Sequence, residues 1–315
     1  MLFVARLPTR VAYGLGRVGG TLQYQVESSK RRMVLGCFEL AFGDRLTPEE
    51  RIRLAHEHFR VWACKDLDRM RLAGNGQGFA KLVEVRGLEH VENALAQGKG
   101  AVIGSAHFGS WEAEVGLLGI LGFPVRLIAD RKRGRELSLR EMFVRPKGLP
   151  LKLLDDTLRR HLRPAIIVDK GSRHMVADEA ARVLAQNELV FVMMDVVTSP
   201  ARHPSSVPMP FLNGLAHLPT GAIRIAKSTG APLLFCLIHR SRDWRHQTMT
   251  ISAPIPTEGD TYEINRRCTR LIENTIRREP AQWRFWTYEL LASIGLIPMK
   301  ELKRRVGTEG RIIWY

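Results

Sequence analysis

Short apolar runs alternate with amphipathic segments along most of this chain. Continuous apolar runs, which are typical of strands covered on both faces, occupy residues 101–105, 125–129, 165–168, 189–194 and 232–239. Apolar positions at helical spacing occupy residues 87–98, 111–121, 219–228 and 262–279. Two weaker strands are expected at 83–85 and 248–252, the second at a sheet edge. The alternation predicts an α/β fold with a mostly parallel central sheet flanked by helices.

The first 80 residues have a helical pattern. A helix is expected from Pro48 to about Leu72, because Thr47 is a suitable N-cap and two acids fill the first turn. A glycine-rich break at residues 74–78 follows. We therefore expect an N-terminal helical segment over residues 1–80 and an α/β domain over residues 81–315.

The extreme N-terminus alternates apolar residues with Arg6, Arg10 and Arg17. No apolar run reaches about twenty residues, so the sequence predicts no conventional membrane-spanning helix. The charge order also differs from that of a signal peptide. A basic amphipathic segment that lies on anionic lipid fits residues 1–25, and an ordinary surface helix is the alternative.

The chain is strongly basic, with 48 Lys and Arg, 32 Asp and Glu, and a formal net charge of +16. Such a surface predicts an anionic partner: nucleic acid, anionic lipid or an acidic carrier protein. No helix-turn-helix, zinc-finger or RNP pattern supports nucleic acid. The stretch from Arg131 to Arg163 concentrates the charge, with eleven Lys and Arg against four Asp and Glu. A substrate-binding surface and a solvated face both fit it.

The four cysteines, at positions 37, 64, 236 and 268, form no C-x-x-C pair and accompany no histidine cluster. We expect them to be reduced and mostly buried, which favours the cytosolic side of a membrane over a secreted compartment. The sequence predicts no metal site.

A histidine follows the apolar run at residues 101–105, and small residues then lead into a helix with an acid in its first turn. His107 at this strand-to-helix junction suits a general base near neutral pH. Glu112 could fix the tautomer of His107. Five residues along a straight helix rotate a side chain by about 140°, so the two can meet only if His107 precedes the helix. Otherwise Asp130 or Asp195, each at the end of a neighbouring strand, could orient His107.

These residues are part of a longer ordered pattern. His107, Trp111 and Glu112 fit an H-x-x-x-[WL]-E block, Asp130 and Asp195 follow two later strands, and Arg240 follows another. Residues 208–216 and 280–286 read PMPFLNGLA and PAQWRFW. Over roughly residues 30–290 the chain resembles the bacterial lipid A acyltransferases, a family that includes lauroyl and myristoyl transferases and phosphatidylinositol mannoside acyltransferases.

The resemblance implies a glycerolipid acyltransferase-like fold of the lysophospholipid acyltransferase superfamily and an HX4E catalytic motif. His107 and Glu112 would be catalytic, and Asp130 or Asp195 would support them. Both expected substrates carry negative charge, so Arg131, Arg133 and Arg240 are the expected substrate-binding residues, with arginine suited to phosphate.

We expect a membrane-associated enzyme that moves a fatty acyl chain from acyl carrier protein or acyl-CoA to a hydroxyl of a glycolipid or lysophospholipid. A thioester carries its own activation, so no cofactor is expected. The expected location is the cytoplasmic face of a bacterial inner membrane, peripheral or monotopic, with no nucleic-acid partner. A serine hydrolase is disfavoured because residues 104–107 lack the second glycine of G-x-S-x-G. A catalytically inactive, lipid-binding relative remains the alternative.

Overall fold

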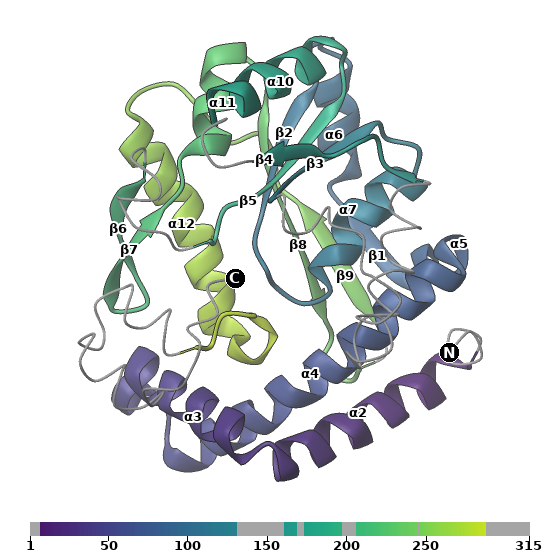
Figure 1. Ribbon diagram of the computed structural model, residues 1–315, viewed down its shortest axis with the longest axis vertical. Helices are drawn as coiled ribbons and strands as arrows, with labels where there is room; N and C mark the ends of the chain where they lie inside the picture. The colour runs from purple at the N-terminus through teal and green to yellow at the C-terminus, as the bar shows by residue number, and fades with distance from the viewer. Residues whose placement is uncertain (1–6, 131–160, 169–172, 197–205, 245, 288–315) are drawn as a thin grey trace.

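A seven-stranded sheet forms the centre of the described part of the protein (Figure 1). The structure is a computed structural model that describes residues 7–130, 161–168, 173–196, 206–244 and 246–287. In spatial order the strands are β1 (Val83–Arg86), β9 (Gln247–Ile251), β8 (Leu233–Arg240), β2 (Ala101–Ser105), β5 (Leu189–Met193), β3 (Val125–Asp130) and β4 (Ile166–Val168). Only the β8–β9 pair within this sheet is antiparallel. The prediction of an α/β fold with a mostly parallel sheet is confirmed.

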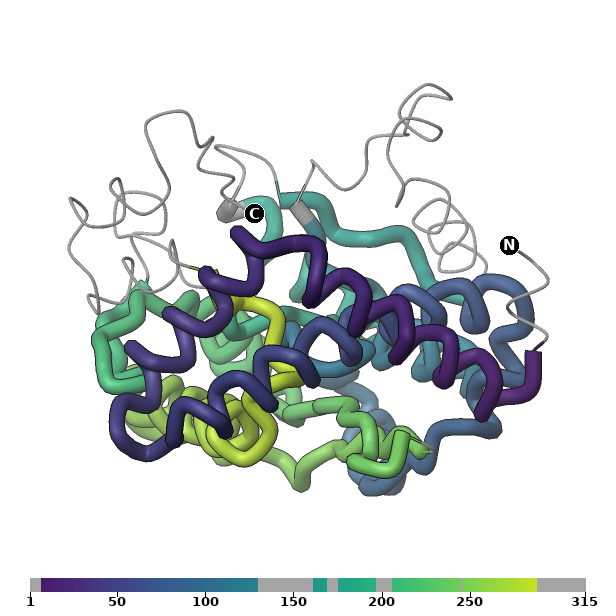
Figure 2. Tube along the Cα trace, turned by 90° about the horizontal axis from the view of Figure 1, so that it is seen from below, coloured from purple at the N-terminus to yellow at the C-terminus, as the bar shows by residue number. Residues whose placement is uncertain are grey.

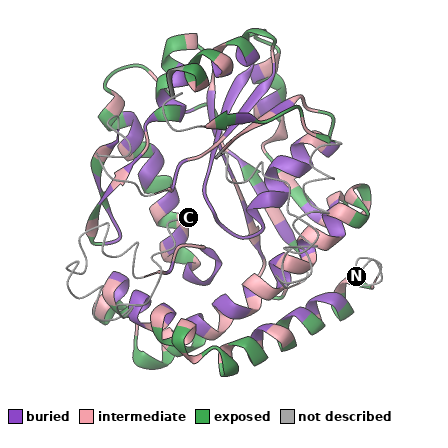
Figure 3. Ribbon diagram, in the orientation of Figure 1, coloured by how far each residue is buried: buried purple, intermediate pink, exposed green. Residues whose placement is uncertain are grey.

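Helices cover both faces of this sheet. Apolar residues of α6 (Leu88–Leu95) and α7 (Trp111–Ile120) form one cluster with alternate residues of β2, Ala101 and Ile103. Residues of α10 (Arg173–Ala185), α11 (Gly221–Thr229) and α12 (Thr261–Arg278) join a second cluster, to which the intervening Val102 belongs. Every residue of β2 is buried, as its continuous apolar run predicts. Figure 3 shows the buried strands between the two helical layers.

Among the residues described before the sheet, the α-helices are α2 (Thr9–Val26), α3 (Ser28–Phe42), α4 (Pro48–Gly74) and α5 (Gly76–Ala80). The start of α4 is as expected, because the Thr47 hydroxyl accepts from the Glu50 amide while the Glu50 carboxylate accepts from the Thr47 amide. Figure 2 shows α2 lying alongside α4. Their backbones approach closely at Gly20, where a Cβ atom would lie 2.5 Å from the Cα atom of Arg60.

The helical segment shares its core with the sheet. Phe38 of α3 and Phe59 of α4 belong to the same apolar cluster as Val102 and Phe235 of the sheet. The boundary at residue 80 falls between α5 and β1, and the division into two units stays a prediction. Within the residues described, no helix has both the length and the apolar character needed to cross a membrane.

Two features differ from the sequence-based expectation. Strand β9 was expected at an edge, but it lies between β1 and β8, and β1 forms the edge. A hairpin of β6 (Val207–Phe211) and β7 (Gly214–Leu218) was not expected, because prolines disfavour strands. Pro208 and Pro210 occupy alternate, exposed positions of β6, and among the described strands β6 pairs only with β7, as is typical of strands that contain proline.

Candidate active site

His107 lies just beyond β2, in the short connection before α7. Its Nδ1 atom is 2.8 Å from Oδ1 of Asp195, which follows β5. Its backbone N–H donates to Oδ2 of the same carboxylate at 2.7 Å. Because β2 and β5 are neighbouring parallel strands, their carboxyl ends bring these two residues together. Of the three acids that could orient His107, the structure therefore places Asp195 against it.

A segment near residue 283 completes the surroundings of this pair. Trp283 donates its indole N–H to Oδ2 of Asp195 at 2.9 Å, and the Arg284 amide donates to the His107 carbonyl at 3.0 Å. The rings of Trp111 and Phe285 flank the imidazole, with centroids 4.6 and 4.8 Å away. Both members of the pair are buried, and no described residue hydrogen-bonds Nε2 of His107. The imidazole is thus fixed through Nδ1 and leaves Nε2 for a reactant.

Gly109 explains why the connection after β2 carries small residues. It has a φ of +51°, and a Cβ atom there would lie 2.3 Å from the Ile238 carbonyl oxygen on β8. A side chain would meet both a strained backbone conformation and a steric clash. Glycine therefore lets the chain turn close to β8 and directs His107 toward Asp195.

Glu112 has different partners. Its Oε1 atom accepts from Lys65 Nζ at 2.9 Å and from the guanidinium of Arg69, including Nε at 3.0 Å. Burial opposes ionisation of Glu112, but the two cations outweigh it and lower the pKa of Glu112 to about 2. Burial lowers the pKa of Lys65 to about 7, while Glu112 opposes that change. No hydrogen bond joins Glu112 to His107 among the described residues; the carboxylate anchors α7 to α4 instead.

A second buried network lies beside the first, around Asp68 of α4. Its Oδ1 accepts from the Tyr13 hydroxyl at 2.6 Å, and its Oδ2 accepts from Ser110 Oγ and Arg240 Nη2. Burial and the charge of Asp68 raise the pKa of Tyr13 above its usual range, so the phenol keeps its proton. Ser110 occupies the N-cap position of α7, but its side chain makes no capping bond and donates to Asp68 instead.

Arg240 belongs to this network. Its guanidinium pairs with Asp68 and lies 4.1 Å from the centroid of the Tyr13 ring. It is nearly fully buried, although Nη1 has no hydrogen-bond partner. Its partners in the structure are therefore protein groups, and the expected contact with substrate stays a prediction.

Three other candidates cannot be placed at the site by their side chains. Asp130 ends β3 and pairs with Val168 of β4, and only its backbone is described. Arg131 and Arg133 lie outside the described residues. Their roles stay predictions.

The residues of α4 that contact the site were not predicted from the sequence. Lys65, Asp68 and Arg69 lie at spacings of three and four, which places them on one side of the helix. That pattern is typical of a solvated charged face, yet Lys65 and Asp68 are both at most 2% exposed. Trp283 is also part of the site, because its buried indole donates a hydrogen bond to Asp195.

Glu114 is a further buried acid, on α7. Ser105 Oγ and the Ile238 amide both donate to its carboxyl group. Burial raises the pKa of Glu114 well above its usual range, and the carboxyl group links α7 to β2 and β8. Among the described residues, no group of three or more His, Cys, Asp or Glu could hold a metal ion.

His107 is thus a buried histidine held by an aspartate at the carboxyl end of a mostly parallel sheet, an arrangement whose chemistry suits general base catalysis. Residues 1–291 match the family model described as bacterial lipid A biosynthesis acyltransferase, and the chain belongs to that family. The expected resemblance is confirmed.

The chain is also similar to phosphatidylinositol mannoside acyltransferase of Mycobacterium tuberculosis, from strains H37Rv and CDC 1551. Each is 24% identical over 223 residues, which cover 70% of this chain and 64% of the relative. The match thus spans just under two thirds of the length of these relatives.

Proposed function

We propose that this protein is a membrane-associated O-acyltransferase that uses His107 as its general base. The donor is a fatty acyl thioester of acyl carrier protein or CoA, and the acceptor is a hydroxyl of a glycolipid or lysophospholipid. The observation that carries the proposal is the contact of His107 Nδ1 with Asp195 at 2.8 Å. An N–H at Nδ1 leaves a lone pair on Nε2, which is the form of imidazole that can remove a proton.

The proposed reaction requires no group beyond the two substrates and these side chains. Nε2 of His107 takes the proton of the acceptor hydroxyl as its oxygen attacks the thioester carbonyl carbon. The tetrahedral intermediate then breaks the carbon–sulfur bond, and the imidazolium returns the proton to the departing thiolate. Asp195 stabilises the imidazolium and holds the ring orientation.

Glu112 has a positioning role in this proposal. Its carboxylate holds Lys65 and Arg69 against the first turn of α7, five residues after the base. Both cations are occupied by Glu112, so in this proposal they hold α7, which follows the base, against α4. We propose that Arg131 and Arg133 bind phosphate groups of the substrates.

Helix α2 supports the membrane part of the proposal. Five large apolar side chains recur along it at spacings of three and four and are 47–79% exposed: Val11, Leu15, Val18, Leu22 and Val26. These spacings gather them on one side of the helix, separate from the buried face formed by Ala12, Tyr13, Gly16 and Gly20. An exposed apolar stripe beside arginines is typical of a helix that lies in a membrane interface.

The proposed location of the enzyme and of its lipid acceptor is the cytoplasmic face of a bacterial inner membrane. The four cysteines are buried and form no disulfide bond in the structure, which describes all of them, and this is compatible with a reducing compartment.

Lipid profiling tests the proposed function directly. Mass spectrometry of lipids from cells with the gene, without it, and with His107→Ala should show one lipid that loses an acyl chain in both altered strains. The alternative, an inactive lipid-binding protein, is favoured by the same apolar stripe. Identical lipid profiles in all three strains would support that alternative and contradict acyl transfer.

A further inference from the structure

A cavity of about 720 Å³ lies between α2, the start of β1 and the turn that joins β8 to β9. Its volume falls within the range of small-molecule sites. None of His107, Glu112 or Asp195 lines it. Tyr13 is the lining residue that leads toward the active site, through its hydrogen bond to Asp68. The cavity is therefore separate from the proposed catalytic centre.

Gln247, at the start of β9, lines this cavity and is 2% exposed. Neither Oε1 nor Nε2 of its amide has a hydrogen-bond partner. A buried amide without hydrogen-bond partners costs folding free energy, because its water contacts are lost and not replaced. A ligand with hydroxyl or phosphate oxygens would remove that cost, because the amide can both donate and accept.

Trp244 lines the cavity from the β8–β9 turn in a strained conformation. Its φ is +63°, which a bulky residue rarely adopts. Hydrogen bonds of Ser241 with Trp244 and with His246 hold this turn in place. Strained residues that the surroundings hold in place are typical of ligand sites. The Trp244 ring also carries the guanidinium of Arg17, 5.5 Å from the ring centroid.

The cationic residues that line the cavity are Arg10, Arg17 and Lys81. All three are exposed, and none is in an ion pair with another described residue. Arginine side chains suit phosphate, since the guanidinium offers paired donors. Their charges are thus open to an anionic ligand.

Two carboxylates also line the cavity, and both already have partners. Glu84 is bound by the guanidinium of Arg86 at 2.8 and 3.1 Å. Asp243 accepts from the Ser241 hydroxyl. The charge of Glu84 is therefore compensated by Arg86, which leaves three cationic lining residues against Asp243, and this balance favours an anion.

We propose that this cavity is a second ligand site, which binds a phosphate ester that carries a polyol or a sugar. Arg10, Arg17 and Lys81 bind the phosphate, the Gln247 amide hydrogen-bonds the hydroxyls, and the Trp244 ring packs against the carbon skeleton. Such a group occurs in soluble sugar phosphates and in anionic lipid headgroups. A lipid headgroup as the ligand would depend on the proposed membrane contact of α2. Binding of a phosphate ester as such does not depend on that contact.

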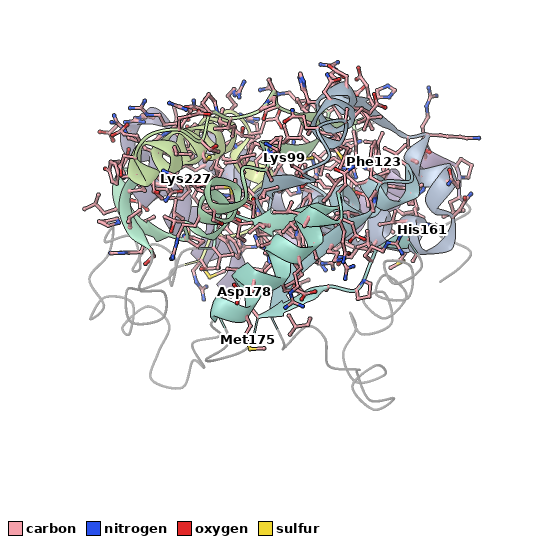
Figure 4. All side chains as sticks on the ribbon, turned by 90° about the horizontal axis from the view of Figure 1, so that it is seen from above. Lys99, Phe123, His161, Met175, Asp178 and Lys227 are labelled. Carbon is pink, nitrogen blue, oxygen red and sulfur yellow. The ribbon has the colours of Figure 1, made fainter. Side chains whose placement is uncertain are left out.

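Isothermal titration with inositol 1-phosphate, and co-sedimentation with phosphatidylcholine vesicles with and without phosphatidylinositol, test the proposal. The variants are Gln247→Leu, which keeps the charge, and Arg17→Ala. The control is Lys99→Ala, an exposed residue before β2 at the other end of the sheet (Figure 4). If Gln247→Leu does not fold, Trp244→Gly replaces it, because glycine tolerates a positive φ.

We expect saturable binding that both variants weaken by at least about tenfold, with the control unchanged, since each loses hydrogen bonds to a charged or polar ligand group. Binding of inositol 1-phosphate identifies the phosphate ester itself as sufficient, and binding only of phosphatidylinositol vesicles identifies the lipid headgroup. No saturable binding of either probe, or equal binding by the variants, overturns the proposal. Binding is measured without an acyl donor, so its failure and a failure of acyl transfer are distinguishable.

Discussion

Replacing Asp195 by asparagine is expected to abolish most of the activity while leaving the fold intact. Oδ2 of Asp195 accepts from two buried donors, the His107 amide and the Trp283 indole. An asparagine NH₂ group turned toward them would leave both donors without partners, at about 1–3 kcal/mol each. The asparagine oxygen therefore takes that position, and its NH₂ group faces Nδ1 of His107.

That orientation gives the wrong tautomer. Nδ1 must then accept, so the ring proton moves to Nε2, which can no longer take a proton from the acceptor. Losses of about 10³–10⁴-fold in kcat are expected, which correspond to about 4–5.5 kcal/mol. KM should change little, because Asp195 is fully buried and acts through His107.

The assay measures thiol release from palmitoyl-CoA, or from the palmitoyl carrier protein, while a membrane lipid extract supplies acceptors. Asp178→Asn is the matched control, since Asp178 is an exposed carboxylate on α10 (Figure 4), and its kcat should equal that of the wild type. Urea unfolding checks that both variants are folded. A folded Asp195→Asn variant with kcat within about threefold of the wild type would refute the reasoning.

The remaining predictions concern stability and the membrane. Glu112→Gln should destabilise the protein by roughly 3–5 kcal/mol in urea unfolding, because it leaves buried Lys65 without its counter-ion, whereas Arg69 keeps Asp66; an unchanged midpoint would count against the ion pair of Lys65. The pKa of Glu112 falls from 4.5 to about 2 on folding, so its contribution to stability is present above about pH 4.5 and is lost as the pH falls toward 2. The Glu112→Gln variant should lack this part of the pH dependence of stability. Gly109→Ala should lower Tm, because Gly109 has a positive φ and a Cβ atom there would clash with β8. The control Gly19→Ala, in open space on α2, should raise stability by about 0.5–1 kcal/mol. Similar Tm values for the two variants would contradict the local geometry at Gly109. The double variant Leu15→Gln, Leu22→Gln should bind anionic vesicles at least about tenfold more weakly, because each side chain loses apolar burial of about 1 kcal/mol or more, and wild-type co-sedimentation would exclude α2 as the contact.

The regular elements of the sheet could be predicted because buried parallel strands are continuously apolar. The limits expected for β2 agree with the structure to the residue, and those of β3, β5 and β8 to within one residue. The place of β9 could not be predicted, because its pairing partner β1 lies some 160 positions earlier in the chain and no local pattern encodes such a contact.

The site was predictable only in part. His107 could be recognised from its position after a buried strand, but spacing along one helix could not decide which acid contacts it. That choice depends on the adjacency of β2 and β5, a tertiary fact. For the same reason the partners of Glu112 on α4 could not be predicted, because Lys65 and Arg69 read as a solvated face until α4 packs against α7.

The most direct test of the central claim is the acyl transfer rate of purified His107→Ala protein, measured with both thioester donors and the membrane lipid extract. If His107 is the general base, wild-type protein forms an acylated lipid, and the folded variant forms it at least about a hundredfold more slowly. Equal rates for the two proteins, or no acylated lipid from the wild type with either donor, would contradict the account.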